Sequence, residues 1–232
     1  MAEHITELTA YYNARASEYE EIYHRQDPEQ QAELARIAKQ LDKLFLRLDI
    51  IDVACGTGYW TNMVAPDAFH VTGIDLSEEM LSVARNGTRN HNVEYRLADA
   101  YDLGRWPAKF DGALVNFWLS HVPKSKLTDF LSGLHSKLSR NSIVFMADNV
   151  YVPGLGGELL EEEGREDTFK LRTLRNGTTH KVIKNYYDRH SLKVLFEPRS
   201  KELDVWEGRF YSTIKYAVPE TTIELINQEG GY

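Results

Sequence analysis

Between residues 48 and 147 the sequence alternates short apolar segments with amphipathic ones, and this alternation restricts the fold more than any other feature. Five apolar segments have the length and composition of strands: 48–54, 69–75, 93–97, 110–117 and 142–147. Three segments between them have helical patterns: 59–65, 77–86 and 124–138. Strands that alternate with helices pair in parallel through right-handed crossovers. The sequence therefore predicts an α/β fold built on a mostly parallel sheet.

Both ends of the chain add elements to this core. Residues 5–24 and 28–46 have helical patterns, and Asp27 followed by Pro28 suits the start of the second helix. Three later segments predict one helix and two antiparallel strands: 188–196, 201–206 and 209–218. The two added strands bring the predicted sheet to seven.

Charge and composition exclude several classes of protein. The 232 residues carry a net charge of −8, which argues against general affinity for nucleic acids. Apolar runs stay far below the roughly 20 residues of a membrane-spanning helix, and residues 1–10 hold no apolar signal segment. The single cysteine allows no internal disulfide and suits a reducing compartment. We therefore expect a cytoplasmic protein that acts on neither nucleic acid nor membrane, and we expect no metal.

The turn Asp52-Val-Ala-Cys-Gly-Thr-Gly58 follows the first predicted strand and opens a helix. Its glycines let the backbone come close to a ligand, although a plain strand–helix corner would use them too. A dinucleotide site would need a third glycine where Thr61 stands. Asp52 suits an ammonium group and repels a pyrophosphate. S-adenosylmethionine (SAM) carries an ammonium and a sulfonium but no phosphate, so charge favours SAM over a dinucleotide.

Later side chains stand where a nucleoside would need them. Asp75 ends the second predicted strand, where its carboxylate could accept both ribose hydroxyls. Met80 lies one turn into the next helix, near an adenine. Asp99 follows the third strand and could accept from the adenine N6 amine, or it could cap a helix. These spacings add to the argument for SAM.

Four segments appear in the order and spacing found in class I SAM-dependent methyltransferases, and the chain resembles that family: IDVACGTG, VTGIDLSEEML, VEYRLADA and FDGALVNFWLSHV. The resemblance implies a Rossmann-like sheet, methyltransferase activity and SAM as the cofactor. It also implies a SAM site made of these residues: Asp52, Ala54, Gly56, Gly58, Trp60, Thr61, Asp75, Leu76, Met80, Asp99, Ala100, Asn116, Phe117 and Trp118.

The N-terminal stretch from Tyr11 to Tyr19 resembles the YYxxRAxEY lid helix of small-molecule members of that family. Tyr11, Arg15 and Tyr19 would share one helical face. A phenol and a guanidinium on that face could hold the SAM carboxylate. Without the resemblance, an amphipathic surface helix with aromatic anchors is the better explanation.

His121 is the candidate group for acceptor chemistry, because it closely follows the fourth predicted strand. It could act as a base, contact the acceptor, or close a turn before Pro123. Family members that methylate a nucleobase or amide nitrogen commonly carry Asn/Asp-Pro-Pro-Tyr/Phe at this point, and this chain does not. The pattern therefore disfavours those nitrogen acceptors.

Asn176-Gly177 stands between the strand-like segments 171–175 and 178–182 and predicts a β-hairpin. A two-residue turn would place Arg172 directly opposite Lys181. Like charges in that position destabilise a strand pair unless solvent screens them or an anion lies between them. A carboxylate or phosphonate held by both side chains is the sharper interpretation.

The same register assigns the other basic side chains of the hairpin to faces. Lys170 would share the face of Arg172, whereas Arg175 and Lys184 would point to the other. Between residues 165 and 201 there are ten Lys/Arg and four Asp/Glu. A solvated basic surface remains the plainer explanation for most of them.

With the segments GTGYWT, FWLSHVP and LRTLRNGTTHKVIK, the chain as a whole resembles bacterial small-molecule O-methyltransferases of natural-product biosynthesis, a group that includes phosphonate-esterifying members. The resemblance implies substrate contacts from Tyr19, His121, Arg172 and Lys181. We expect one domain over 1–232, with these parts: a helical lid (1–46), a SAM-binding core (47–150), a cap insertion (151–187), and a C-terminal helix with antiparallel strands (188–218).

The leading hypothesis is therefore transfer of a methyl group from SAM to an oxygen of a small anionic acceptor. Methylation of nitrogen or carbon on a neutral small molecule is the alternative within the same chemistry. A SAM-binding protein that does not transfer methyl groups is an alternative of another class, and a dinucleotide-dependent oxidoreductase is the least favoured.

Overall fold

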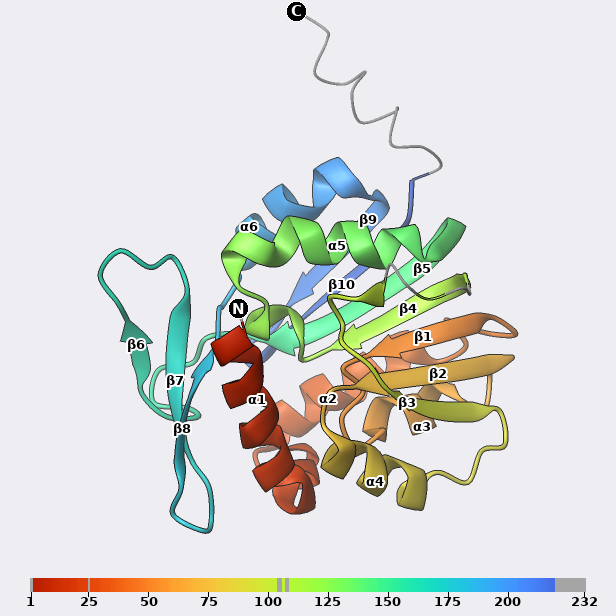
Figure 1. The fold of residues 1–232 in the computed structure, drawn as a ribbon. Coiled ribbons are helices and arrows are strands. Elements are labelled where there is room, and N and C mark those ends of the chain that lie inside the picture. Colours follow the sequence, from red (N-terminus) through yellow and green to blue (C-terminus); the bar gives the residue numbers. More distant parts are fainter. Residues whose placement is uncertain (1, 25, 104–105, 107–108, 220–232) are drawn as a thin grey trace, which may run out of the picture.

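The computed structural model describes residues 2–24, 26–103, 106 and 109–219 (Figure 1). Its central sheet has seven strands in the order β3-β2-β1-β4-β5-β10-β9. Strands β1 to β5 run parallel, and β10 is antiparallel to both of its neighbours. The predicted α/β fold with a mostly parallel seven-stranded sheet is confirmed. The strands are β1 (Asp49–Val53), β2 (His70–Asp75), β3 (Val93–Leu97), β4 (Phe110–Asn116), β5 (Leu138–Asn149), β9 (Lys201–Glu207) and β10 (Tyr211–Ala217).

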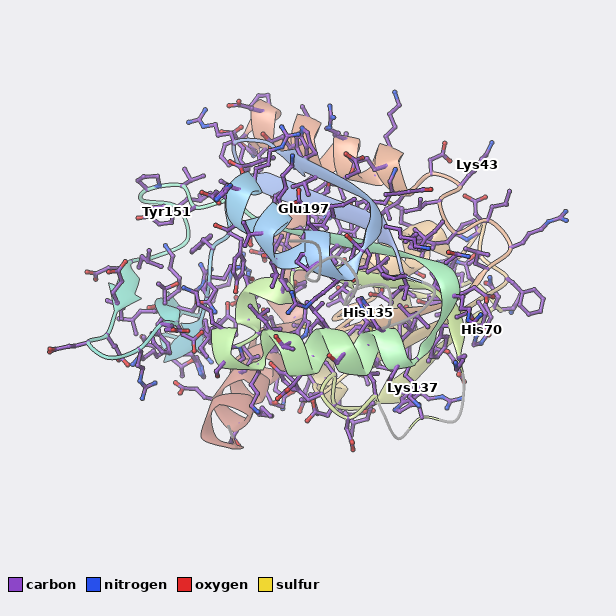
Figure 2. The ribbon with its side chains drawn as sticks, turned by 90° about the horizontal axis from the view of Figure 1, so that it is seen from above. Lys43, His70, His135, Lys137, Tyr151 and Glu197 are labelled. Carbon is purple, nitrogen blue, oxygen red and sulfur yellow. The ribbon has the colours of Figure 1, made fainter. Side chains whose placement is uncertain are left out.

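A hydrophobic core lies on each face of this sheet, because successive residues of a buried strand point to opposite sides. Ile50 of β1 shares a core with α2 and α3, whereas Ile51 shares one with α5 and α6. Figure 2 looks down on the second face, with His135 on α5 and Glu197 at the end of α6. The helices are α1 (Ala2–Arg15), α2 (Pro28–Leu41), α3 (Tyr59–Val64), α4 (Glu78–Gly87), α5 (Leu127–Ser136) and α6 (Arg189–Phe196).

Short 3₁₀ helices complete the main body: η1 (Ala16–Tyr23), η3 (Leu119–His121), η4 (Lys124–Lys126) and η5 (Glu197–Arg199). The helix predicted over 124–138 is shorter, since η4 precedes it and β5 already begins at Leu138. Within the residues that the structure describes, no helix is both long and apolar enough to cross a bilayer.

The N-terminal helical segment differs from its prediction. In place of one helix over 5–24, α1 ends at Arg15 and the chain continues as η1. A 3₁₀ helix has three residues per turn instead of 3.6. Tyr19 therefore lies on η1 rather than on the α-helix that carries Tyr11 and Arg15. The three side chains still come together, because the Arg15 guanidinium lies over the rings of both tyrosines.

The second helix begins as predicted but ends early. The side chain of Asp27 accepts a hydrogen bond from the backbone N–H of Gln30 at 3.0 Å, which caps α2 at its N-terminus. The helix ends at Leu41 rather than at residue 46. Lys43 (Figure 2) and Arg47 then adopt left-handed φ angles of 56° and 60°, which turn the chain into β1.

A second, three-stranded sheet stands beside α1 (Figure 1). It consists of β6 (Leu159–Glu161), β7 (Thr168–Thr173) and β8 (Thr179–Ile183) in antiparallel order. Strands β7 and β8 are the predicted hairpin, but their loop has three residues, not two. Leu174 and Thr178 close the loop, and Gly177 takes the left-handed φ of 83° that such a loop needs at its third position.

The longer loop makes the predicted register wrong by one residue. Arg172 lies opposite His180, and Lys181 lies opposite Leu171. A shift of one residue moves a side chain to the other face of a strand. Arg172 and Lys181 therefore point to opposite sides of the hairpin, and Lys184 shares the side of Arg172.

Candidate functional site

The turn between β1 and α3 brings backbone close to the carboxyl ends of the central strands. Gly56 and Gly58 have φ angles of 57° and 78°, and Ala54 also has a positive φ of 55°. A side chain at Gly58 would place its Cβ 2.3 Å from the hydroxyl oxygen of Tyr95. Glycine is therefore required at position 58 by both backbone conformation and space.

Asp75 at the end of β2 joins this turn to the start of α4. Its Oδ2 accepts from the backbone N–H of Gly56 at 2.9 Å, and its Oδ1 accepts from that of Ser77 at 2.8 Å. Burial raises the pKa of this carboxyl. Each carboxylate oxygen has a further lone pair, so Asp75 can still accept hydrogen bonds from a diol.

A first cavity opens above Asp75, between the carboxyl ends of the strands and the N-terminal helical segment. Ten residues expected at the SAM site line it: Tyr19, Ala54, Gly56, Asp75, Leu76, Met80, Ala100, Asn116, Phe117 and Trp118. Seven residues that are not expected from the sequence also line it: Ile5, Leu8, Thr9, Tyr12, Ser77, Ala98 and Tyr101. The expected residues outside its lining are Tyr11, Arg15, Asp52, Gly58, Trp60, Thr61 and Asp99.

Asp52 is bonded to α3, the helix that follows the glycine turn. It is only 2% exposed, and its Oδ2 accepts a hydrogen bond from the Thr61 hydroxyl at 2.5 Å. Trp60 similarly donates its indole N–H to the hydroxyl of Tyr23 at 3.1 Å. The carboxylate expected to meet an ammonium group is thus bonded inside the protein.

The buried position of Asp52 predicts a pH effect on stability. Burial raises the pKa of Asp52 to about 7, against about 4 in an unfolded chain. The folded state then binds the proton more tightly, so this group stabilises the fold at low pH. That contribution falls by up to about 1.4 kcal/mol per pH unit as the pH rises from about 4 to about 7. Denaturant unfolding of Asp52→Asn across this range should lose that slope.

The matched control is Asp129→Asn, on the exposed side of α5, where Asp129 pairs with Lys126 at 2.8 Å. This variant should keep the slope of the unmodified chain. An identical pH profile for Asp52→Asn and the unmodified chain would show that Asp52 is ionised throughout the range.

Asp99 closes a turn after β3 and caps no helix among the described residues. Its Oδ1 accepts from the backbone N–H of Tyr101 at 2.8 Å. Ala100 and Tyr101 then line the first cavity next to it. Whether Asp99 also meets an adenine stays a prediction.

The first cavity fits a nucleoside. Both amide atoms of Asn116, the indole N–H of Trp118 and the hydroxyl of Tyr101 are buried and without a hydrogen-bond partner. Buried polar groups are nearly always bonded, so these three lining residues call for a polar ligand. No described residue of the lining is a lysine or arginine, which disfavours a pyrophosphate. Apolar walls from Leu8 and Met80 suit a flat base.

A second cavity adjoins the first. Both are lined by Tyr12, Tyr19 and Phe117, so these three rings form the boundary between them. Phe117 holds this place with a left-handed φ of 60°, a strained conformation for a side chain of its size. The remaining residues of the second cavity are Tyr11, Arg15, Ile22, Tyr23, His121, Asn149, Arg172, Lys184 and Tyr211.

The second cavity is strongly basic. Arg15, Arg172 and Lys184 line it, and no carboxylate does among the described residues. Arg15 lies over the rings of Tyr11 and Tyr19, at 5.5 and 5.1 Å from their centroids. Such cation–π contacts hold the guanidinium in place without neutralising it.

Lys184 is the most deeply placed of the three cations. It is 3% exposed, and burial lowers its pKa. Its Nζ donates to Ser120 Oγ at 2.6 Å and pairs with Asp148 Oδ1 at 3.1 Å. Asp148 offsets one of the three positive charges, so the cavity keeps a net positive charge.

His121 lines the second cavity and contacts Tyr12. Its Nδ1 is 2.7 Å from the carbonyl oxygen of Ile183, and its Nε2 is 3.0 Å from the hydroxyl of Tyr12. A carbonyl oxygen only accepts, so Nδ1 carries the hydrogen. In the neutral ring, Nε2 then accepts from Tyr12. His121 therefore reaches the boundary of the two cavities mainly through Tyr12.

Lys181 is the one expected acceptor residue that lies elsewhere. Its ammonium pairs with Glu162 and lies 4.4 Å from the ring centroid of Phe169. Lys181 is therefore on the face of the hairpin opposite to Arg172, here called the outer face. The anion clamp of Arg172 and Lys181 is therefore not formed, because the hairpin register differs from the expected one. Arg15 and Lys184 take the place expected for Lys181 in the second cavity.

Comparisons with known proteins agree with this geometry. Residues 50–141 match the family model described as a methyltransferase domain. The chain is 38% identical over 81 residues to the demethylmenaquinone methyltransferase of Listeria monocytogenes, a match that spans 32% of this chain and 34% of that protein. It is 30% identical over 132 residues to the carboxy-S-adenosyl-L-methionine synthase of Campylobacter hominis, covering 55% of this chain and 53% of that protein. The matches thus span about a third to a half of these curated relatives.

Solved structures match over nearly the whole chain. The DhpI–SAH complex superposes with a TM-score of 0.76 at 25% identity, covering 95% of this chain and all of that one. The DhpI–SAM–HEP complex gives a TM-score of 0.75 at 27% identity, covering 93% and 98%. With the family model, the cavity geometry and these cofactor-bound neighbours together, the chain carries a class I methyltransferase domain whose cofactor is SAM.

Proposed function

We propose that the chain transfers the methyl group of SAM to an oxygen of a small anionic acceptor, a carboxylate or a phosphonate, bound in the second cavity. The observation that carries the proposal is the cluster of Arg15, Arg172 and Lys184 in a cavity without a lining carboxylate among the described residues. Of these three cations, only Lys184 pairs with an acid among the described residues, namely Asp148, so the cluster favours an anionic ligand over a neutral one.

The arrangement of the two cavities supports the reaction by position. When bound, SAM supplies an electrophilic methyl group on its sulfonium. Asp75 and Asn116 are placed to hold the cofactor in the first cavity. Arg15 and Arg172 are placed to orient the acceptor acid toward the shared boundary. Fixing two reactants in line supplies much of the rate of such a displacement.

The boundary rings exclude water and stay neutral. Burial raises the pKa of Tyr19 to about 12, and burial also raises the pKa of Tyr12 well above its usual range. Both phenols therefore remain protonated at neutral pH, and Tyr12 donates a hydrogen bond to His121 Nε2. An ionised acid needs no base, so this mechanism assigns no proton transfer to His121.

Label transfer tests the proposal. The chain is incubated with methyl-labelled SAM and one of three acids: methylphosphonate, phenylphosphonate or benzoate. Benzylamine and benzyl alcohol, which have no acid group, are the control acceptors. We expect label in the methyl ester of at least one acid, identified by mass spectrometry. Label only in benzylamine or benzyl alcohol would overturn the choice of acceptor, and no label in any compound with SAM still bound would favour a SAM-binding protein that transfers no methyl group.

The role of His121 separates the proposal from N- or C-methylation of a neutral acceptor. With an ionised acid, His121→Gln should keep kcat within about tenfold, since loss of a required base costs about 10²–10⁴-fold. Steady-state rates with saturating acid measure this. His70→Gln is the control, because His70 lies at the start of β2, at the other end of that strand from Asp75 (Figure 2). A larger fall in kcat with unchanged acceptor affinity would make His121 a required base, which transfer to an ionised acid does not need.

A further inference from the structure

Lys170 of β7 is a buried lysine outside both cavities. It is 1% exposed, and lysine is almost never that buried unless its charge is paired. The ion pairs found among the described residues do not include it. Its Nζ instead donates to the carbonyl oxygens of Leu155 at 3.3 Å and Gly157 at 2.5 Å. A charge buried this way requires an explanation, because it costs free energy.

The rings of two tyrosines enclose the same ammonium. Tyr151, labelled in Figure 2 on the loop that leads to the small sheet, has its ring centroid 5.4 Å from Nζ, and Tyr186 lies at 5.9 Å. Burial lowers the pKa of Lys170, and the nearby Arg172 lowers it further. Lys170 and Arg172 are therefore neighbouring cations on one face of β7.

The loop that receives Lys170 also holds Arg172. The carbonyl of Gly156, between the two carbonyls bonded to Lys170, accepts from Arg172 Nη1. Gly156 and Gly157 have φ angles of 73° and 92°. A Cβ at Gly156 would lie 2.6 Å from Arg172 Nη1, and one at Gly157 would lie 2.6 Å from the carbonyl of Leu171. The successive carbonyls of residues 155–157 can all face β7 only because positions 156 and 157 are glycine.

We propose that Lys170 is a positioning residue, which fixes the carbonyls of residues 155–157 so that Gly156 aims the Arg172 guanidinium into the acceptor cavity. Lys170 touches neither reactant. Its two bonds to Leu155 and Gly157 set the position of Gly156, and Gly156 orients one edge of Arg172. The other N–H groups of the guanidinium remain available to an anion. This inference rests on the proposed anionic acceptor.

The test measures anion affinity by titrating methylphosphonate into the chain saturated with S-adenosylhomocysteine (SAH). Lys170→Met keeps a long unbranched side chain and removes the charge. We expect about a tenfold rise in the Kd of methylphosphonate, with the Kd of SAH unchanged. Lys181→Met is the matched control, because Lys181 lies on the same hairpin but on its outer face. It should shift neither constant by more than about twofold.

Two further variants distinguish the possible failures. Gly156→Ala should raise the methylphosphonate Kd on its own, and adding Lys170→Met should have little further effect, because both act on one contact. If Arg172→Ala leaves methylphosphonate binding unchanged, the proposed function fails. If Arg172→Ala weakens binding but Lys170→Met lowers only the melting temperature, Lys170 is a structural residue and the inference is wrong.

Discussion

Arg172→Ala is expected to weaken binding of the acceptor acid about a hundredfold and to leave SAH affinity unchanged. A charge-assisted hydrogen bond contributes about 1.5–3 kcal/mol, and a planar guanidinium can make two to one acid group. Arg172 lines the second cavity and lies outside the first. Its loss should therefore act on the acceptor alone. The measurement is the acceptor KM at saturating SAM, paired with calorimetric titration of SAH.

Lys181→Ala is the control for this experiment. Both basic residues belong to the same hairpin, but the Lys181 ammonium pairs with Glu162 on the outer face. The acceptor KM of Lys181→Ala should stay within about twofold of the unmodified value. Equal effects of Arg172→Ala and Lys181→Ala would contradict the observed register and restore the clamp expected from a two-residue turn.

Asp75→Ala is expected to lower SAH affinity by at least about a hundredfold. The carboxylate holds the backbone N–H groups of Gly56 and Ser77, and it lines the first cavity where we place the ribose. Its removal takes away an acceptor for the diol and leaves two backbone donors without their partner. Calorimetric titration with SAH measures the loss.

A control must separate cofactor binding from general destabilisation. Glu78→Ala removes a neighbouring acid at the start of α4, where Glu78 makes an exposed pair with Arg85. Its SAH affinity should be unchanged. Thermal unfolding of both variants without ligand shows how far each is destabilised. An Asp75→Ala chain that binds SAH normally would remove Asp75 from the cofactor site.

The sequence predicted the sheet well because the signals for a parallel sheet are local. Each buried strand is a short apolar run, and the crossover helix α4 begins at its own polar cap, Ser77. The position of Asp75 follows from the same logic, since the carboxyl ends of parallel strands meet at one edge. These features depend on nearest neighbours along the chain.

The faces of the hairpin could not be predicted in the same way. Asn176-Gly177 suits a two-residue loop, but Gly177 can equally be the left-handed third residue of a longer one. One residue of difference exchanges the two faces. For that reason Lys184 was expected to point away from Arg172, and Lys181 was expected beside it.

The N-terminal segment shows which signal was overlooked. Ile5, Leu8, Thr9 and Tyr12 all line the first cavity, and their spacing of three, four and seven is that of one helical face. The family pattern directed attention to Tyr11 and Arg15 instead. These lie on the adjacent face and line the second cavity.

Asp52 was misplaced for a different reason. Its charge suits an ammonium group, but a charge argument does not show which way a side chain points. The buried hydrogen bond to Thr61 depends on how the glycine turn folds over β1, which involves residues nine positions apart.

In the proposed complex, an acid binds in the second cavity and faces the cofactor across Tyr12, Tyr19 and Phe117. A crystal structure with SAH and methylphosphonate would show this arrangement. We expect SAH in the first cavity and phosphonate oxygens within hydrogen-bonding distance of Arg15 and Arg172. SAH in the first cavity with the phosphonate bound outside the second would contradict this arrangement.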